Sequence, residues 1–434
     1  LFCHSSQYNF ISVRMCYYYA KGWSKFWPIV RHNHFNFRML SYFTPEILCH
    51  PSRQDDIQQT LSLRQSLFDY PKLLSDYQLY KKMAPSDPKK VELYSSMMVD
   101  LKKFPNRIHP SIIGFTVPQI TELCNQKRES SQTLLTFEKL GEIFGGYRQK
   151  QLGTMTGSKT YYLTEAFAEL EKALINYTLD YLVQNGFSLV SVPDVIPRKV
   201  IQSCGFDTNS VRSQVYFLNR MDPEELCLSG TSEIALSNFC EGREMNLKEL
   251  PLRFAAVSRC HRAEVANISR EKGFYRVHQF YKVEMFGVTR NDDGESSALL
   301  LEILDHQKHL LTNLGLHFRV LNMPAYELGD SAYQKYDIEA WMPGRGYYGE
   351  VTSASNCTDY QSSRLNMTLK TESGLTEFVH TINGTACAVP RVLIAVIENN
   401  QLTNSIAIPD VLRPFMRGRS VLSLPKNRNV YRFR

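Results

Sequence analysis

Charged and aromatic residues recur at alternate positions in two segments near the middle of the chain, 251–264 and 274–289. These residues are Arg262, Glu264, Phe280, Lys282 and Glu284. Because side chains alternate across a strand, each segment, taken as a strand, places its set on one face. A guanidinium can hold phosphate oxygens, an aromatic ring can stack on a base, and a carboxylate can accept hydrogen bonds from amino groups. The segments therefore predict a strand-loop-strand hairpin that binds a nucleotide, with a solvated sheet face as the alternative.

Two further segments offer polar groups for a small substrate and a metal ion. Thr231, Ser232 and Glu233 supply hydroxyls and a carboxylate that suit a substrate with an ammonium group, although such a run by itself is more often a helix N-cap. Glu350 and Ser353 offer oxygen ligands for a divalent cation that bridges phosphates. Beside the hairpin, these segments predict a combined site for a nucleotide and a small amine.

Glycines predict a turn at 344–349, and a proline predicts the start of a helix at 390. Gly344, Gly346 and Gly349 spell G-x-G-x-x-G, but a strand-like run follows them, whereas a dinucleotide-binding loop needs a helix there. They therefore predict a glycine-rich hairpin turn. Pro390 precedes an apolar helical run, which places Arg391 in a first helical turn, where backbone N–H groups favour anions.

The elements that must position these residues follow from periodicity. Apolar residues at helical spacing predict a helix over 164–185 that stops at Gly186, and the alternation in 187–192 predicts a strand. Upstream, 54–103 shows helical spacing on both sides of the turn sequence 84–88. This pattern predicts a short antiparallel helical hairpin, about 13 to 15 residues in each arm and on the order of 20 Å long.

Three blocks of the sequence resemble the signature motifs of class II aminoacyl-tRNA synthetases: a helix and strand ending at Pro193, a strand-loop-strand beginning at Arg262-Ala263-Glu264, and a strand and helix ending at Arg391. Within and around these motifs, the individual residues resemble those of the seryl-tRNA synthetase family, and most closely those of its animal mitochondrial branch. The matching runs are 230–233, 275–284, 337–339, 353–361 and 380–385.

The resemblance implies an ATP site and a Mg²⁺ site. Arg262 is expected to bind the α-phosphate and the serine carboxylate, and Phe280 to stack on adenine. Glu264 is expected to contact the adenine amino group, and Arg391 to hold the γ-phosphate; with Arg262, these two make up the catalytic set. The remaining ATP-binding residues implied are Glu350, Val351, Thr352 and Ser353, of which Glu350 and Ser353 hold Mg²⁺.

A serine pocket is implied in the same way. Thr231, Ser232 and Glu233 surround the amino group of serine, and Arg262 binds its carboxylate. The residues implied for the hydroxyl end and its surroundings are Glu284, Asn383 and Thr385. A pocket that pairs the substrate hydroxyl rejects alanine strongly, because its own buried polar groups are otherwise left unpaired.

The net charge of +7 is carried by the two ends of the chain. Residues 1–45 hold five basic and no acidic residues, the 22 residues from Arg413 to Arg434 hold seven basic and no acidic ones, and the remainder has 38 basic against 43 acidic residues. The N-terminal composition is that of a mitochondrial transit peptide. The sequence contains no run of eighteen apolar residues, so it does not predict a membrane-spanning helix. The ten scattered cysteines predict reduced, mostly buried thiols.

The prediction for the whole chain is an α+β protein, a class II synthetase antiparallel sheet flanked by helices and preceded by a short helical hairpin. The predicted segments are a transit peptide (1–45), a shortened tRNA-binding arm (46–110), the catalytic domain (111–418) and a basic tail (419–434). The resemblance implies a homodimer in the mitochondrial matrix that charges serine tRNA. The arm is much shorter than is usual in the family; candidate phosphate contacts are the tail and Lys81, Lys82, Lys89, Lys90, Lys102 and Lys103.

Two alternatives stay open at this point. A catalytically inactive paralogue that binds RNA or a dimer partner is favoured by the short arm, but such a protein is expected to lose the charged site residues that this chain keeps. A synthetase for proline or threonine could use the same Thr-Ser-Glu sequence; the serine-type blocks around Asn356 and Asn383 argue against it.

Overall fold

All residues described by the computed structural model belong to one unit of the chain, Leu40–Arg434. They are 44–127, 133–149, 157, 159–210, 213–219, 225–264, 273–372 and 374–424. The predicted transit peptide lies almost wholly outside them. The tail beyond Leu424 and residues 265–272 of the hairpin loop also lie outside them.

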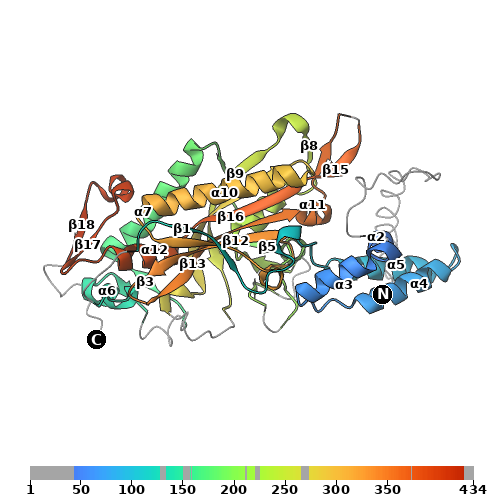
Figure 1. Cartoon of the computed structure of the whole chain (residues 1–434), viewed down its shortest axis with the longest axis horizontal. Helices are drawn as coiled ribbons and strands as arrows, with labels where there is room; N and C mark the ends of the chain where they lie inside the picture. Colours follow the sequence, from blue (N-terminus) through green and yellow to red (C-terminus); the bar gives the residue numbers. More distant parts are fainter. Residues whose placement is uncertain are drawn as a thin grey trace, which may run out of the picture. The chain divides into compact units, whose positions relative to one another are not determined.

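The N-terminal part of this unit is a small helical arm, drawn in blue in Figure 1. Its helices are α2 (Pro45–Leu48), α3 (Gln54–Leu63), α4 (Tyr70–Lys82) and α5 (Pro88–Leu101). Asp69 and Asp87 cap α4 and α5, each accepting a hydrogen bond from a first-turn backbone N–H. Buried side chains of the helices and of the exit segment, including Phe104, form an apolar core that also contains Tyr360 from the body of the fold. The predicted helical hairpin is therefore confirmed, with its turn at 83–87.

The centre of the fold is an eight-stranded sheet of order β1-β11-β12-β13-β16-β10-β9-β4. All neighbouring pairs are antiparallel except β4 with β9. In that order the strands are β1 (Gln119–Cys124), β11 (Phe318–Asn322), β12 (Gln334–Met342), β13 (Tyr347–Thr358), β16 (His380–Ala388), β10 (Gln279–Thr289), β9 (Leu252–His261) and β4 (Ser188–Leu189). The predicted fold class, an antiparallel sheet flanked by helices, is confirmed.

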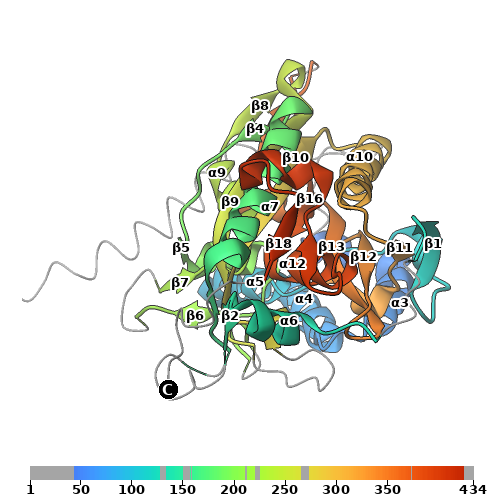
Figure 2. The ribbon, with the colours of Figure 1, turned by 90° about the vertical axis from the view of Figure 1, so that its left-hand side faces the viewer.

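Three long helices cover one face of this sheet: α7 (Glu165–Gln184), α10 (Asp293–Asn313) and α12 (Val389–Asn399). In Figures 1 and 2, α10 runs alongside β16 and β13, while α7 and α12 lie next to each other. On β10, Val283 and Met285 point into the core beneath these helices, so Lys282 and Glu284 point to the opposite face. That opposite face carries the polar residues of the predicted site.

Smaller elements make up the rest of the fold. They are α6 (Phe137–Phe144), α8 (Arg198–Ser203), α9 (Ser232–Phe239), α11 (Tyr360–Leu365), β2 (Tyr147–Arg148), β3 (Tyr162–Leu163), β5 (Val195–Pro197), β6 (Tyr216–Phe217), β7 (Leu226–Leu228), β8 (Glu244–Asn246), β14 (Thr368–Lys370), β15 (Thr376–Phe378), β17 (Ser405–Ala407) and β18 (Val421–Ser423). α9 packs on β9 and β10, and α11 packs on β16 and β13. Gln361 of α11 is hydrogen-bonded to Glu233 of α9, so the two helices are joined on this side of the sheet.

Several local predictions can be compared directly with the structure. Helix α7 ends before Gly186, which has φ +85°, as predicted. The first two glycines of the G-x-G-x-x-G run, Gly344 and Gly346, lie in the turn between β12 and β13, and Gly349 lies in β13. Of the strand predicted over 187–192, only Ser188–Leu189 (β4) pairs with a neighbouring strand. The second hairpin strand was predicted from Phe274 but starts at Gln279, because Gly273–Tyr275 forms a 3-10 turn that buries Phe274. Every described cysteine is a free thiol, and all but Cys124 are buried. Among the described residues, no helix has the length and apolar character needed to cross a bilayer.

Candidate active site

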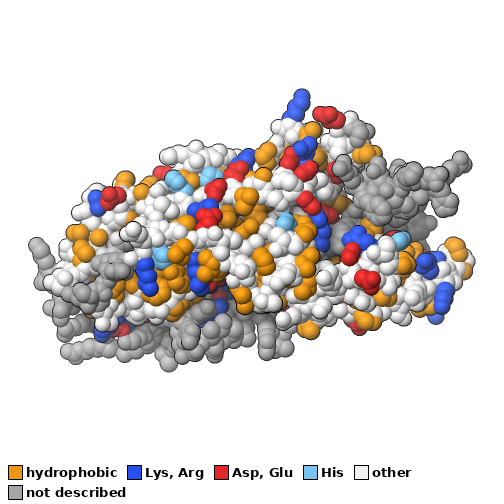
Figure 3. All heavy atoms as spheres, viewed as in Figure 1, with side chains coloured by type: hydrophobic (Ala, Val, Ile, Leu, Met, Phe, Trp, Pro, Cys, Tyr) orange, Lys and Arg blue, Asp and Glu red, His pale blue; other side chains and the backbone are white. Residues whose placement is uncertain are grey.

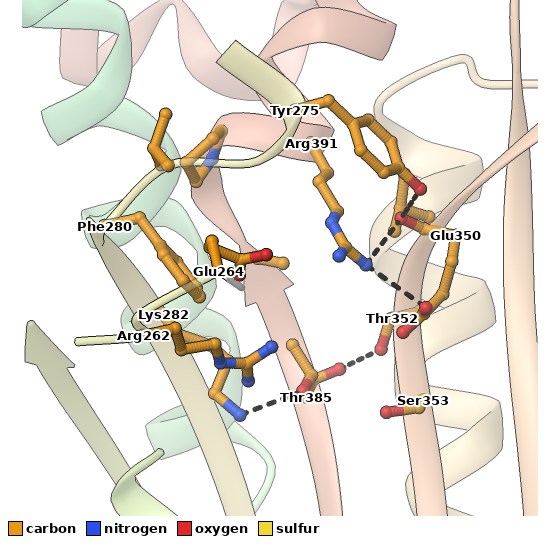
Figure 4. A pocket seen from close by; sticks show the side chains of 14 residues that line it. Arg262, Glu264, Tyr275, Phe280, Lys282, Glu350, Thr352, Ser353, Thr385 and Arg391 are labelled. Carbon is orange, nitrogen blue, oxygen red and sulfur yellow. Dashed lines mark hydrogen bonds and ion pairs between the residues drawn. The ribbon is translucent and has the colours of Figure 1, made fainter. Parts of the chain in front are cut away.

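A cavity opens on the polar face of the sheet, between the ends of β9 and β10 and the start of α12 (Figure 4). Its walls combine cations, carboxylates, hydroxyls and aromatic rings. The lining residues are Arg262, Glu264, Tyr275, Val277, Phe280, Lys282, Glu350, Val351, Thr352, Ser353, Thr385, Ala388, Pro390 and Arg391. Every residue predicted for the ATP site is therefore part of one cavity.

Arg262 stands at the end of β9, on one wall of the cavity. Its backbone N–H donates to the carbonyl of His278 at 2.8 Å, and its guanidinium Nε and Nη2 donate to the carbonyl of Gly230, both at 3.3 Å. The guanidinium carbon is 5.3 Å from the ring centre of Phe280. These contacts hold a cation beside an aromatic face, an arrangement suited to a phosphate next to a base.

Glu264 lines the same wall in an unusual backbone conformation. Its φ is +48°, a left-handed value that few residues other than glycine adopt, and its backbone N–H donates to the side chain of Gln214 at 2.7 Å. Its carboxylate, 7% exposed, pairs with Arg276 at 3.1 Å. The carboxylate is thus already partnered by a cation at the cavity edge.

Arg391 and Glu350 face each other on the opposite wall (Figure 4). Arg391 Nη1 lies 3.2 Å from the Glu350 carboxylate and donates to its carbonyl at 3.3 Å. The guanidinium carbon of Arg391 is 4.6 Å from the ring centre of Tyr275, whose hydroxyl donates to the Glu350 carbonyl at 3.0 Å. Burial raises the pKa of Glu350, but Arg391, Lys335 and Arg262 outweigh it and lower the pKa to about 2. Glu350 is therefore a carboxylate at neutral pH.

A β-bulge brings Glu350 and Ser353 to the same cavity although they are three residues apart. On β12, the neighbours Ile338 and Glu339 pair with Thr352 and Glu350, so one residue of β13 is left without a partner. Positions three apart in a regular strand face opposite sides, and one extra residue reverses that relation. Glu350 and Ser353 both line the cavity for this reason.

The surroundings of this pair fit a hard divalent cation. The side chain of Glu350 is 40% exposed, so its oxygens are reachable, and the ligands offered by Glu350 and Ser353 are oxygens. Asp337, the neighbour of Ser353 on β12, is 6% exposed, and its Oδ1 accepts no hydrogen bond within the described part of the chain. Burial raises the pKa of Asp337 to about 7, with Lys335 opposing the rise and Glu350 adding to it.

A second group of polar residues, called the Lys282 group below, lies deeper than the cavity walls. The ammonium of Lys282 forms an ion pair with Glu284 and lies 2.7 Å from Thr231 Oγ1 and 3.4 Å from Thr385 Oγ1. Thr385 Oγ1 donates to Glu284 at 3.3 Å. Lys282 and Glu284 are 6% and 2% exposed. Because a buried carboxylate is costly without a partner, Lys282 is the group that stabilises Glu284 in this position.

Glu233 completes this deeper group from the first turn of α9. Its Oε1 accepts hydrogen bonds from Gln361 Nε2 at 2.6 Å and from Asn383 Nδ2 at 2.9 Å. Burial raises its pKa to about 7, and the nearby carboxylate of Glu284 adds to the rise. Thr231 is the N-cap of α9, so the helix-cap interpretation of this run is correct, and it is compatible with the functional one.

The predicted serine-binding residues are only partly joined to the cavity. Arg262 and Thr385 line it, whereas Thr231, Glu233, Glu284 and Asn383 lie behind Lys282 in the buried group. Ser232 points elsewhere, because its hydroxyl bonds to that of Ser258 at 2.7 Å. The sequence pattern placed Lys282 on the polar face with Phe280 and Glu284 but gave it no specific role. It gave no role to Tyr275 or Gln361 either, because their roles depend on contacts far along the chain.

An antiparallel sheet with cations, an aromatic ring and a carboxylate around one cavity defines the catalytic core of the class II aminoacyl-tRNA synthetases. Residues 216–400 match the family model "tRNA synthetase class II core domain (G, H, P, S and T)". A solved structure of seryl-tRNA synthetase from Pyrococcus horikoshii complexed with ATP superposes with a TM-score of 0.73 and 29% identity, covering 86% of this chain and 88% of that one.

Two curated relatives narrow the class further. The mitochondrial serine–tRNA ligase of Saccharomyces cerevisiae is 39% identical over 76% of this chain and 75% of its own length. That of Mus musculus is 43% identical over 78% of this chain and 66% of its own length, so the chain spans slightly less than two thirds of that relative. The chain belongs to the serine–tRNA ligase family.

Proposed function

We propose that this protein activates serine with ATP and transfers the seryl group to the 3′ end of a serine tRNA. The observation that carries the proposal is the cavity in which Arg262, Phe280, Glu350 and Arg391 meet, with the Lys282 group directly behind it. A nucleotide and a small amino acid can therefore be held side by side on one sheet face.

Activation needs the carboxylate of serine to attack the α-phosphorus of ATP while pyrophosphate leaves. Phe280 stacks on adenine, and Glu264 receives its amino group. Arg262 holds the α-phosphate and the serine carboxylate, so that both reacting groups approach the same guanidinium. Arg391, fixed by Glu350 and Tyr275, neutralises charge on the outer phosphates. Positioning and electrostatic stabilisation supply most of the rate enhancement.

Mg²⁺ is the expected cofactor of this step. Glu350 and Ser353, which the bulge of β13 places in the cavity, would hold the ion, and Val351 and Thr352 form the strand between them. When bound, the ion supplies positive charge to the phosphate oxygens. The ionised state of Glu350 suits this role, because a ligand to Mg²⁺ must be deprotonated.

In this proposal, the Lys282 group recognises serine. Glu233 and Thr231 receive the ammonium, with Asn383 holding Glu233 and Ser232 bracing α9 through Ser258. Glu284 and Thr385 pair with the hydroxyl. Alanine offers no hydroxyl to these groups, so the hydrogen bonds gained with serine are lost, at about 1.5–3 kcal/mol for a hydrogen bond to a charged group.

The tRNA is proposed to contact the helical arm. Figure 3 shows Lys and Arg side chains at the outer end of the arm, and Lys81, Lys82 and Lys89 are exposed on α4 and α5. Lys90 lies 4.8 Å from the ring centre of Tyr80, which extends the basic surface over an aromatic one. Such a surface binds a nucleic-acid backbone through phosphate contacts that weaken as salt increases.

The assembly and location proposed are a homodimer in the mitochondrial matrix. Val183 on α7 and Leu189 on β4 are 49% and 56% exposed, which leaves apolar surface on the elements that end at Pro193. The relatives named above as mitochondrial, together with the basic, acid-free composition of residues 1–45, support the location.

Serine-dependent exchange of pyrophosphate into ATP by the purified full chain tests the proposal, with a panel that includes alanine, threonine and proline. Arg262→Ala is expected to abolish exchange. Arg253→Ala is the matched control, because Arg253 also lies on β9 and pairs with Glu302 at 2.6 Å outside the cavity. It should exchange like the unsubstituted protein.

The possible outcomes separate the alternatives. Exchange that is specific for serine and lost only in Arg262→Ala supports the proposal. Exchange with proline or threonine would reassign the substrate. A folded protein that exchanges with no amino acid would make the non-catalytic, RNA-binding paralogue the better description.

A further inference from the structure

The segment that connects the helical arm to the sheet, called the arm root below, contains a polar side chain, that of Asn106, which is 0% exposed. Its amide Nδ2 lies within hydrogen-bond distance of the Ser331 carbonyl (2.8 Å), the Cys357 carbonyl (2.8 Å) and Thr358 Oγ1 (3.0 Å). Its backbone N–H donates to the carbonyl of Asp330 at 2.8 Å. A single side chain from the arm root thus reaches the last residues of β13.

The end of β13 that Asn106 holds is a distorted piece of backbone. Asn356 pairs with Ile382 and Thr358 pairs with Thr381, so Cys357 is an extra residue in the strand. Thr358 has φ +46°, a left-handed value that a β-branched residue adopts only when its surroundings impose it. Asn106 binds the Cys357 carbonyl and the Thr358 hydroxyl, on the two sides of this distortion.

The distorted segment leads directly to the residues that orient Glu233. Three residues after Thr358, in the first turn of α11, Gln361 donates to Glu233 Oε1 at 2.6 Å. The other donor to that oxygen, Asn383, also contacts Cys357 Sγ at 3.4 Å. Both hydrogen bonds that fix the Glu233 carboxylate therefore depend on the course of the chain from Cys357 to Gln361.

We propose that Asn106 is a positioning residue for the amino-acid pocket: it holds the distorted Cys357–Thr358 segment in place and thereby sets the orientation of the Glu233 carboxylate. This inference rests on the proposed function, in which Glu233 receives the ammonium of serine. It gives the arm root a role in serine binding that is independent of tRNA. No contact found among the described residues links Asn106 directly to Arg262, Phe280 or Arg391, so the ATP subsite is left unchanged.

Pyrophosphate exchange without tRNA, with serine and ATP varied separately, tests the inference. Asn106→Ala is expected to raise the KM for serine about tenfold, because buried carbonyls lose their donor and the segment relaxes, and to change the KM for ATP less than about twofold. The neighbouring Arg107→Gln is the control. Arg107 also ties the arm root to the body, through Asp293 at 2.6 and 3.0 Å, but does not touch β13; both its KM values should stay unchanged.

A second variant keeps the test valid if Asn106→Ala folds poorly. Glycine adopts positive φ without strain, so adding Thr358→Gly should restore folding and bring the KM for serine back to within about threefold of normal. A double variant that still fails to fold would place the role of Asn106 in overall stability and overturn the inference.

The remaining outcomes are distinct. Equal increases in both KM values, the same increase in Arg107→Gln, or an unchanged KM for serine in Asn106→Ala would each overturn the inference while leaving the proposed function intact. Absence of exchange in the unsubstituted protein would overturn both.

Discussion

Replacing Glu233 by glutamine should make the protein more stable and a worse enzyme. The carboxylate is 7% exposed, and burial raises its pKa from 4.5 to about 7. A glutamine keeps an oxygen that accepts from Gln361 and Asn383 but carries no charge. The substitution therefore removes the energetic cost of a buried charge together with the group proposed to bind the serine ammonium.

The sign and size of the stability effect follow from proton linkage. Between pH 4.5 and 7 the folded protein holds a proton on Glu233 that the unfolded chain has lost, so raising the pH favours unfolding. A shift from 4.5 to about 7, at about 1.36 kcal/mol for each pKa unit, corresponds to a cost of about 3 kcal/mol at pH 8. At pH 5 the cost is below about 1 kcal/mol. Glu233→Gln should gain these amounts relative to the unsubstituted protein.

Urea denaturation followed by intrinsic fluorescence at pH 5 and pH 8 measures the difference in the free energy of unfolding. Glu241→Gln, an exposed glutamate just after α9, should show no pH-dependent difference. Serine-dependent exchange by Glu233→Gln should require on the order of 100-fold more serine, as expected for the loss of a charged hydrogen bond. A variant that is less stable at pH 8, or equally changed at both pH values, would refute the assignment of a buried charge to Glu233.

Two further predictions concern residues to which the sequence pattern gave no specific role. Lys282→Met should lower the free energy of unfolding by about 3–5 kcal/mol because Glu284 is left buried without its cation, and the double variant with Glu284→Leu should recover most of the loss; a double variant in which the losses add would contradict the ion-pair argument. Tyr275→Phe, which removes the 3.0 Å bond to the Glu350 carbonyl, should raise the KM for ATP severalfold and leave that for serine unchanged, and equal changes in exchange assays would count against a role beside Arg391.

Local sequence patterns were sufficient wherever one element settles the outcome. Pro390 at a helix start placed Arg391 in the first turn of α12, and glycines marked the turn between β12 and β13. Alternation along β10 put Phe280 and Lys282 on the same face as the cavity. These features depend on backbone preferences and periodicities of residues that are neighbours in the chain, so the sequence contains their cause.

Features that depend on residues distant in the chain could not be predicted from neighbouring residues. The strand predicted over 187–192 is only β4, since pairing with β9, and not the alternation itself, determines its length. The 3-10 turn at Gly273–Tyr275 follows from the packing of Phe274 against Phe137, whose rings stack at 4.6 Å. Phe137 precedes this turn by more than a hundred residues, so the residues next to Phe274 in the sequence do not predict the turn.

By itself, then, the sequence determined the fold class, the order of the elements and the chemical types of the site residues. Only the tertiary structure decided that a bulge opposite β12 places Glu350 and Ser353 in one cavity, and that Lys282 neutralises Glu284. It also decided that Asn106 reaches Cys357 from the arm root. The physical reason is that strand register and buried pairing are set by partners distant in the chain, whose contacts exist only once the sheet and its helices have assembled.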